Sequence, residues 1–383
     1  MKVSAKCPVG GALALVLRMS RFVGVAPVIL TQNGIRVSRP LTFYSYFVVT
    51  AINLLTEPKR SLRVRTPTSR MIWVANLSIV ILITGVAAYR APSRFLCIIN
   101  CLKQIQKVFF LGYMSNKRYF NLHSKKILII PCTPLPINHQ PWKLEAYFIV
   151  LLVELQFILI AQKLLSALRL VNDALQQLMV SFKTQESSTV PNKVINYVVD
   201  SLTVKEKLVS ILFHYTRTVR DLSNAYTGIC DILRRIDESH GFLLLLILIS
   251  FFMQLIITPY YLITTLYTSM NQINYILLQI SWCMYHIISM LMVVEPCYQT
   301  QKEMDRTQVL VSYLMRYISS TDPMFVDVDI FCKQLYLDRP SYTPLGMCTI
   351  SRPLTVTIIG AVMTYLVIII QLRSYESNSK DQL

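Results

Sequence analysis

The most constraining feature of the chain is the segment of residues 241–294, which contains no Asp, Glu, Lys or Arg. A helix needs about 20 apolar residues to cross the hydrocarbon core of a bilayer, so this segment is long enough for two spanning helices joined back to back. Its most polar point lies at residues 269–272, which predicts a turn between helices over residues 242–267 and 275–294. We therefore predict an integral membrane protein that contains a helical hairpin.

Composition agrees with this prediction. Hydrophobic residues make up 54% of the chain and charged residues 15%, and the mean hydropathy is +0.47, which is too apolar for an ordinary soluble domain. One further apolar segment carries a single charged residue, Glu154, and three others carry none. These four further segments are residues 40–56, 71–89, 146–162 and 353–372. Together with the two helices of the hairpin they give six predicted spans.

A seventh span is expected between residues 90 and 142, where the sequence is least suited to one. Residues 90–126 are rich in basic side chains and favour a helix in solvent or at the membrane interface. Residues 127–142 hold four prolines, at positions 131, 134, 136 and 141. Because proline breaks a regular helix, we expect this third span near residues 127–142 to be degenerate.

The remaining segments are predicted to lie outside the membrane. Residues 166–240 and 295–352 show apolar positions at helical spacing among polar ones, which indicates projecting helices. In the second block, Thr321, Asp322 and Pro323 are expected to end an amphipathic helix over residues 306–318.

Charge gives the expected orientation. Residues 1–39 contain six basic residues and no acidic ones, which favours a cytoplasmic N-terminal segment with an amphipathic helix over residues 11–30. The loop at residues 57–70 is basic although this orientation makes it extracellular, which is contrary to the bias. The net charge of +18 is interpreted as contact with anionic lipid headgroups, and no nucleic-acid partner is expected because no base-reading module is present.

The residue pattern shows no chemistry of an enzyme. The five histidines are dispersed and no nucleophile elbow or phosphate loop occurs, so no catalytic residue, cofactor or metal site is predicted. The nine cysteines are widely spaced and are interpreted as packing residues.

Two groups of side chains are candidates for binding a small molecule. Glu154 is the one acid well inside a span, where it either serves a function or is turned into the bundle, protonated or hydrogen-bonded to a neighbour. Aromatic residues crowd the hairpin, and they either form an interfacial belt or wall a ligand pocket. The candidates for the pocket are Tyr260, Tyr261, Trp282, Tyr285 and Glu154.

The last apolar segment carries the most specific pattern. Thr364 and Tyr365 are followed by five hydrophobic residues and then by Gln371 and Leu372. This resembles the C-terminal signature of insect gustatory receptors, which is threonine, tyrosine, five hydrophobic residues, glutamine and phenylalanine. Weaker similarity extends from about residue 146 onward. Leu372 departs from the signature, because the family has phenylalanine there.

The resemblance implies an all-α, seven-transmembrane helical bundle with a cytoplasmic helical anchor region. Residues 40–165 would hold helices 1 to 4, and residues 241–294 would hold helices 5 and 6. Residues 166–240 and 295–352 would be the cytoplasmic extension and anchor. Residues 353–372 would line the pore, and residues 373–383 would form an extracellular tail.

The implied function is a tastant-gated, non-selective cation channel subunit in the plasma membrane of sensory neurons. Four equal or different subunits would share one pore, with Gln371 and Leu372 at the gate and Thr364 and Tyr365 supporting it. Leu366 stands where the sugar-sensing branch tends to have an acid, which favours a bitter or other non-sugar ligand. The alternatives are an insect odorant receptor and a G-protein-coupled receptor. Of these, the G-protein-coupled receptor would have an extracellular N-terminus.

Overall fold

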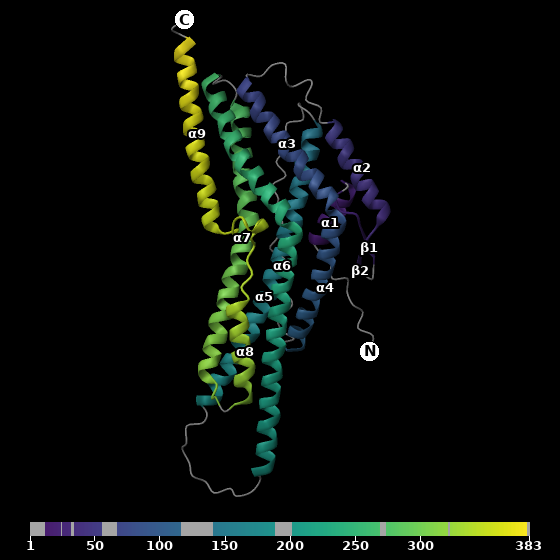
Figure 1. Ribbon diagram of the computed structural model, residues 1–383, viewed down its shortest axis with the longest axis vertical. Helices are drawn as coiled ribbons and strands as arrows, with labels where there is room; N and C mark the ends of the chain where they lie inside the picture. The colour runs from purple at the N-terminus through teal and green to yellow at the C-terminus, as the bar shows by residue number, and fades with distance from the viewer. Residues whose placement is uncertain are drawn as a thin grey trace.

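A computed structural model shows a chain that is almost entirely helical (Figure 1). It describes residues 12–23, 25–31, 34–55, 67–115, 141–187, 201–268, 273–320 and 322–380. The described helices are α1 (Ala12–Phe22), α2 (Arg39–Leu55), α3 (Pro67–Tyr89), α4 (Ala91–Ser115), α5 (Pro141–Ser187), α6 (Ser201–Thr268), α7 (Ile273–Tyr317), α8 (Pro323–Leu337) and α9 (Arg352–Lys380).

Three very long helices run through the centre of the molecule. They are α5, α6 and α7, of 47, 68 and 45 residues. At about 1.5 Å per residue, α6 is roughly 100 Å long, far more than a bilayer needs. The predicted spans and the predicted projecting helices are therefore parts of the same helices, which extend from one end of the molecule toward the other (Figure 1).

The helical hairpin is confirmed. Helix α6 ends at Thr268 and α7 begins at Ile273, on either side of the predicted turn. Pro259 and Pro296 lie inside these helices without ending them. The end of the amphipathic helix is confirmed too, because α7 ends at Tyr317 and Pro323 begins α8 behind the N-cap residue Asp322.

Among the described residues, four helices are long and apolar enough to cross a membrane: Tyr147–Phe182, Thr218–Ile263, Ile276–Tyr317 and Arg352–Gln371. Helices α3 and α4 add a fifth if they are counted as one span, bent by 61° between Tyr89 and Ala91. Helix α2 has 17 residues and is short for a span. The proline-rich residues 127–140 lie outside the described part, so the third span there stays a prediction.

The basic segment predicted to form a helix in solvent or at the membrane interface contains α4, which has one face packed against protein. It buries Phe95, Ile98, Leu102 and Ile105 in the main hydrophobic core, and it packs against α5 and α6. Its apolar residues recur at helical spacing, and that face is covered by protein.

The N-terminal segment contains a strand pair that the sequence analysis did not predict. The helix expected over residues 11–30 ends at Phe22, and β1 (Val28–Thr31) then pairs antiparallel with β2 (Gly34–Val37). Helix α1 packs against α5, where Ser20 accepts a hydrogen bond of 2.7 Å from the side-chain amide of Gln156. The Asn–Gly sequence at positions 33 and 34 is a hairpin signal that was available in the sequence.

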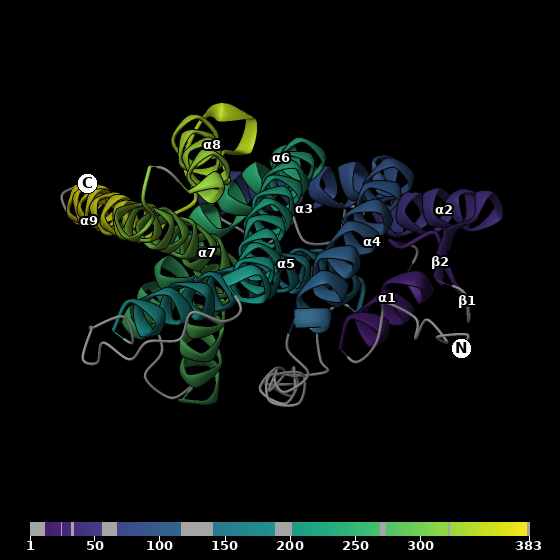
Figure 2. The same ribbon diagram turned by 90° about the horizontal axis from the view of Figure 1, so that it is seen from below.

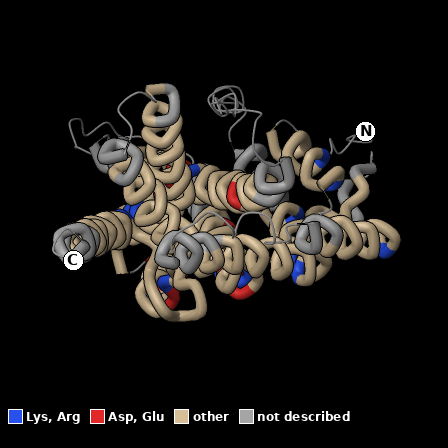
Figure 3. Tube along the Cα trace, turned by 90° about the horizontal axis from the view of Figure 1, so that it is seen from above, with Lys and Arg blue, Asp and Glu red and all other residues tan. Residues whose placement is uncertain are grey.

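The last helix stands at one side of the molecule. Figures 1 and 2 both place α9 at the edge, with the C-terminus at its far end and α7 beside its beginning. Its contacts within the chain are made mainly with α6 and α7. Seen from above, charged residues occupy scattered positions along the tube (Figure 3).

Candidate functional site

Helix α9 presents its polar residues outward. Thr364, Tyr365 and Gln371 are all exposed in the single chain, although they lie in an apolar helix of spanning length. The hydroxyl of Thr364 donates to the carbonyl of Gly360 at 3.1 Å, and the Tyr365 ring meets the edge of Phe252 on α6, with 5.9 Å between ring centroids. The side chain of Leu372 lies outside the described residues.

A buried acid lies between α5 and α7. The side chain of Glu154 on α5 is only 4% exposed, and its Oε2 accepts a hydrogen bond of 2.6 Å from the hydroxyl of Ser289 on α7. Ser289 is also buried. The structure therefore assigns a partner on a facing helix to the one acid predicted well inside a span.

Aromatic rings continue along the same side of α7. Trp282 stacks on Tyr285 with 5.4 Å between centroids, and both meet His286, at 5.3 and 5.2 Å. Trp282 also meets the edge of Tyr147 on α5 at 5.8 Å. We call Tyr147, Glu154, Trp282, Tyr285, His286 and Ser289 the Glu154 cluster.

Two predicted pocket residues lie apart from this cluster. Tyr260 and Tyr261 are neighbours on α6, with 5.7 Å between their ring centroids. Among the described residues, the ring contact of Tyr260 is with Tyr261 and not with an aromatic residue of α7. The structure thus brings together Glu154, Trp282 and Tyr285 through shared contacts, and it leaves Tyr260 outside that group.

The beginning of α9 is clamped to α7 by charge. Arg352, the first residue of α9, donates to both carboxylate oxygens of Glu295 at 2.8 and 3.1 Å. Its guanidinium also lies over the ring of Tyr298, 4.2 Å from the centroid. A bidentate arginine–carboxylate pair with a stacked ring fixes both the position and the orientation of the side chain.

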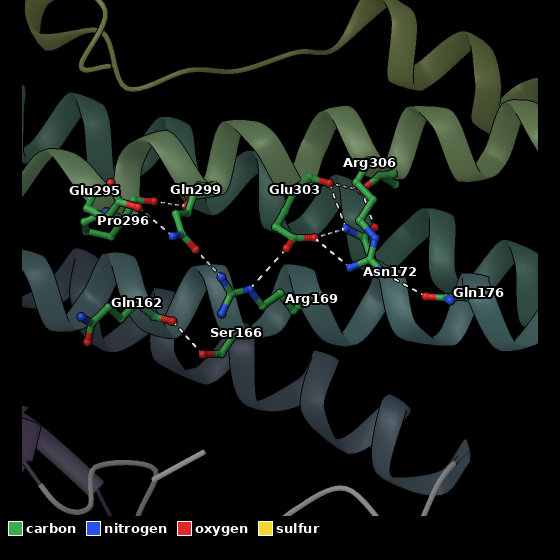
Figure 4. Close-up of polar contacts among 12 residues, drawn as sticks. Gln162, Ser166, Arg169, Asn172, Gln176, Glu295, Pro296, Gln299, Glu303 and Arg306 are labelled. Carbon is green, nitrogen blue, oxygen red and sulfur yellow. Dashed lines mark hydrogen bonds and ion pairs between the residues drawn. The ribbon is translucent and has the colours of Figure 1, made fainter. Parts of the chain in front are cut away.

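The clamp continues into a row of polar side chains between α7 and α5 (Figure 4). Glu295 accepts a hydrogen bond of 2.7 Å from Gln299, which in turn accepts one from Arg169 on α5. Arg169 also pairs with Glu303 at 3.4 Å. We call the whole row the α5–α7 polar ladder, and it consists of Arg169, Asn172 and Gln176 on α5 with Glu295, Gln299, Glu303 and Arg306 on α7.

The far end of the ladder is equally well paired. Asn172 donates to the carboxylate and to the backbone carbonyl of Glu303, each at 2.9 Å. Arg306 donates to Gln176 at 2.8 Å. Since Arg352 begins α9, a continuous chain of hydrogen bonds joins the last helix to α5 through α7.

The segment that leads from α8 into α9 is held against α6. Thr343 donates through its backbone N–H and its hydroxyl to the carboxylate of Asp237, at 3.1 and 3.2 Å. A side chain at Gly241 would put its Cβ only 3.3 Å from the backbone nitrogen of Leu345, so the close approach favours glycine there. Burial raises the pKa of the nearby Tyr342 hydroxyl well above its ordinary value, so that side chain stays neutral.

Sequence reasoning named Glu154, Trp282 and Tyr285 and missed the other residues of the cluster and the ladder, although a signal existed for some. Trp282, Tyr285, His286 and Ser289 follow the i, i+3, i+4, i+7 spacing of one helix face. The polar residues of the ladder also recur three or four apart on each helix. Tyr147 had no such signal, because it joins the cluster only through the packing of α5 on α7. Within the described part, no group of three or more His, Cys, Asp or Glu side chains could hold a metal ion.

Comparison with known proteins gives three results. Residues 13–376 match the family model described as 7tm chemosensory receptor, which represents receptors rather than enzymes. The chain is 28% identical over 154 residues to the gustatory receptor for sugar taste 43a of Drosophila melanogaster, a match that covers 40% of this chain and 35% of that receptor.

The fold is similar to that of the insect olfactory receptor OR5 from Machilis hrabei, with a TM-score of 0.54 and 9% identity, covering 94% of this chain and 97% of that one. The structure of OR5 in complex with eugenol is equally similar, with a TM-score of 0.55. The likeness shows the fold alone at this identity. Together with the apolar helices it identifies a multi-pass membrane protein. Because the family model matches nearly the whole chain, the protein belongs to the 7tm chemosensory receptor family.

Proposed function

We propose that the chain is a gustatory receptor and forms a subunit of a tastant-gated, non-selective cation channel. Four copies, or this chain with related subunits, surround one pore lined by α9. The N-terminus is cytoplasmic and the C-terminal tail extracellular, in the plasma membrane of a sensory neuron. Gln371 and Leu372 form the gate, and Thr364 and Tyr365 support it from the same helix.

The exposure of polar residues on α9 is the observation that carries this proposal. In their most apolar windows only 17% of α9 and 17% of α7 are buried, whereas the corresponding window of α5 is 72% buried. A lipid-facing helix has no reason to expose Tyr365 and Gln371, because unpaired polar groups are costly in hydrocarbon. Packing against other copies around a water-filled path removes that cost.

The helices outside the spans support an assembly of several copies. Large apolar side chains stay exposed along α8 and the end of α7: Val309, Tyr313, Tyr317, Val326, Ile330, Tyr336 and Leu337. Exposed apolar residues in this number suit a protein interface. We propose that residues 166–240 and 295–352 are cytoplasmic and that the second block is the anchor between subunits.

The cluster between α5 and α7 is the proposed ligand site, with Glu154, Trp282 and Tyr285 as contacts and Tyr260 and Tyr261 at its margin. The OR5 complex supports a small-molecule ligand, because that receptor binds eugenol. The similarity to a receptor for sugar taste argues for a gustatory rather than an odorant role. We favour a bitter or other non-sugar ligand, because Leu366 is not an acid.

The proposal is tested by expressing the full chain in cultured cells and recording from excised patches without nucleotides. A compound panel of amines, alcohols and sugars should elicit currents that carry Na⁺ and K⁺ alike. An N-terminal epitope should bind antibody only after permeabilisation. Gln371→Lys should suppress cation current by electrostatic repulsion in the pore, while Gln371→Asn should retain it. An extracellular N-terminus, or currents that require G proteins, would contradict the channel.

A further inference from the structure

We propose that the Glu154 cluster recognises a cationic amine, with the carboxylate of Glu154 bound to the ammonium group and the aromatic rings around the apolar body of the ligand. This inference rests on the proposed function, since it names the chemical class of ligand for the proposed ligand site.

A carboxylate at Glu154 would have no counter-charge among the described side chains. Its hydrogen bond is the one from Ser289, and among the described residues no Lys or Arg forms an ion pair with it. The acids of the polar ladder differ, because Glu295 pairs with Arg352 and Glu303 with Arg169. A buried carboxylate without a counter-charge is costly, so a ligand that brings a positive charge gains most from this position.

The neighbouring groups are those that bind ammonium ions elsewhere. The faces of Trp and Tyr rings attract cations, and the cluster holds Trp282, Tyr285 and Tyr147. The imidazole of His286 is 4% exposed, and its Nε2 has no hydrogen-bond partner. In the neutral tautomer with the proton on Nδ1, that nitrogen accepts a hydrogen bond from an ammonium N–H.

The length of the cluster indicates the size of ligand that would reach along it. Tyr147 and Glu154 are seven residues apart on α5, and Trp282 and Ser289 are seven apart on α7. At about 1.5 Å per residue the cluster is roughly 10 Å long on each helix. Its aromatic end lies toward the hairpin turn that begins α7, and its acidic end lies deeper. The length suits an aromatic body joined to an amine by a short chain.

The test measures binding to the purified full chain in lipid nanodiscs, by the change in tryptophan fluorescence and by the shift in thermal unfolding. The probes are three amines with their alcohol counterparts: benzylamine with benzyl alcohol, 2-phenylethylamine with 2-phenylethanol, and tryptamine with tryptophol. Glucose, fructose and sucrose form the sugar arm. We expect at least one amine to bind tenfold or more tightly than its alcohol, and Glu154→Gln to remove that preference.

Asp173→Asn is the matched control, because Asp173 is an exposed acid on the same helix, and it should bind amines as the unaltered chain does. Ser289→Ala should weaken amine binding less than Glu154→Gln, because it leaves the charge in place. Each variant must elute from size-exclusion chromatography at the same volume as the unaltered chain. If Glu154→Gln fails to fold, Glu154→Asp is used instead. This variant keeps the carboxylate but shortens the side chain, so it should weaken the preference for amines over alcohols.

The proposal is overturned if no amine binds, if alcohols or sugars bind as tightly as amines, or if the Glu154 variants keep the amine preference. The outcomes separate it from the channel proposal. Amine binding without any current would leave the inference standing and contradict the channel. Currents evoked by sugars or alcohols but not by amines would leave the channel standing and overturn the inference.

Discussion

At the scale of single residues, Asn172 is a fully buried amide on α5 that is hydrogen-bonded on both sides. It donates to Glu303 and accepts a hydrogen bond of 2.6 Å from the hydroxyl of Thr307. Replacing it by leucine of similar size removes these bonds, while Glu303 keeps its pair with Arg169 and Thr307 keeps its bond to the carbonyl of Glu303. We expect Asn172→Leu to lower the free energy of unfolding by about 1–3 kcal/mol.

The measurement is thermal unfolding of the purified chain in detergent, followed by intrinsic fluorescence. Asp173→Leu, an exposed change on the next residue of the same helix, should leave the unfolding temperature nearly unchanged. Equal unfolding temperatures for Asn172→Leu and the unaltered chain would show that the amide bonds contribute nothing to stability.

Residue-level reasoning from the sequence has a clear limit in the Glu154 cluster. An acid inside a span and aromatic residues on a hairpin are visible in the sequence, so Glu154, Trp282 and Tyr285 could be named as candidates. Their contacts could not be predicted from the sequence, since Glu154 and Ser289 are 135 residues apart in the chain. Which side chains meet depends on the rotation of α5 against α7.

At the scale of elements, the clamp between Arg352 and Glu295 joins the last helix to α7. Both side chains are partly open to solvent, so the pair contributes little to stability. Its position at the start of α9 gives it a role in gating if α9 moves relative to α7. We expect Glu295→Arg and Arg352→Glu each to shift the ligand concentration for half-maximal current by at least about twofold, and the double exchange to restore it.

The check is a dose–response curve for each variant, recorded with the same ligand and the same surface expression. The exchange Lys333→Asp with Asp329→Lys on α8 is the matched control, because this pair lies within one exposed helix and joins no two elements. If the shift in half-maximal ligand concentration for the double exchange equals the sum of the shifts for the two single variants, on a logarithmic scale, the clamp is not coupled to gating.

Element prediction succeeded where a local pattern decides. The polarity of residues 269–272 located the boundary between α6 and α7, and Thr321, Asp322 and Pro323 located the end of α7. It failed for the lengths of the helices. The sequence analysis predicted spans and projecting helices as separate elements, whereas in the structure each span and its projecting part form one continuous helix. A helix continues through a change from apolar to polar surroundings as long as its backbone hydrogen bonds are kept.

At the scale of the whole molecule, the exposed side of α9 gives a test of assembly. Met363 is 59% exposed in the single chain, whereas its neighbour Val362 is 6% exposed. If copies of α9 surround a pore, Met363→Cys should form covalent pairs under a mild oxidant, and Val362→Cys should not.

The unaltered chain provides the background, because it already contains nine cysteines. Covalent pairs are measured on denaturing gels of intact membranes, and the mass of the particle in nanodiscs should correspond to four copies. A particle with the mass of one copy, or equal cross-linking at both positions, would contradict the assembly.

The sequence by itself determined the class of molecule and its family. Long uncharged segments can satisfy their backbone groups in a bilayer only as helices, and the pattern of Thr364, Tyr365, Gln371 and Leu372 is read without any contact. Only the tertiary structure decided which polar groups are paired. It balanced Glu303 against Arg169 and Glu295 against Arg352, and it left Glu154 with a hydroxyl alone. Charge compensation inside a helical bundle depends on how distant helices pack, and no local pattern encodes that packing.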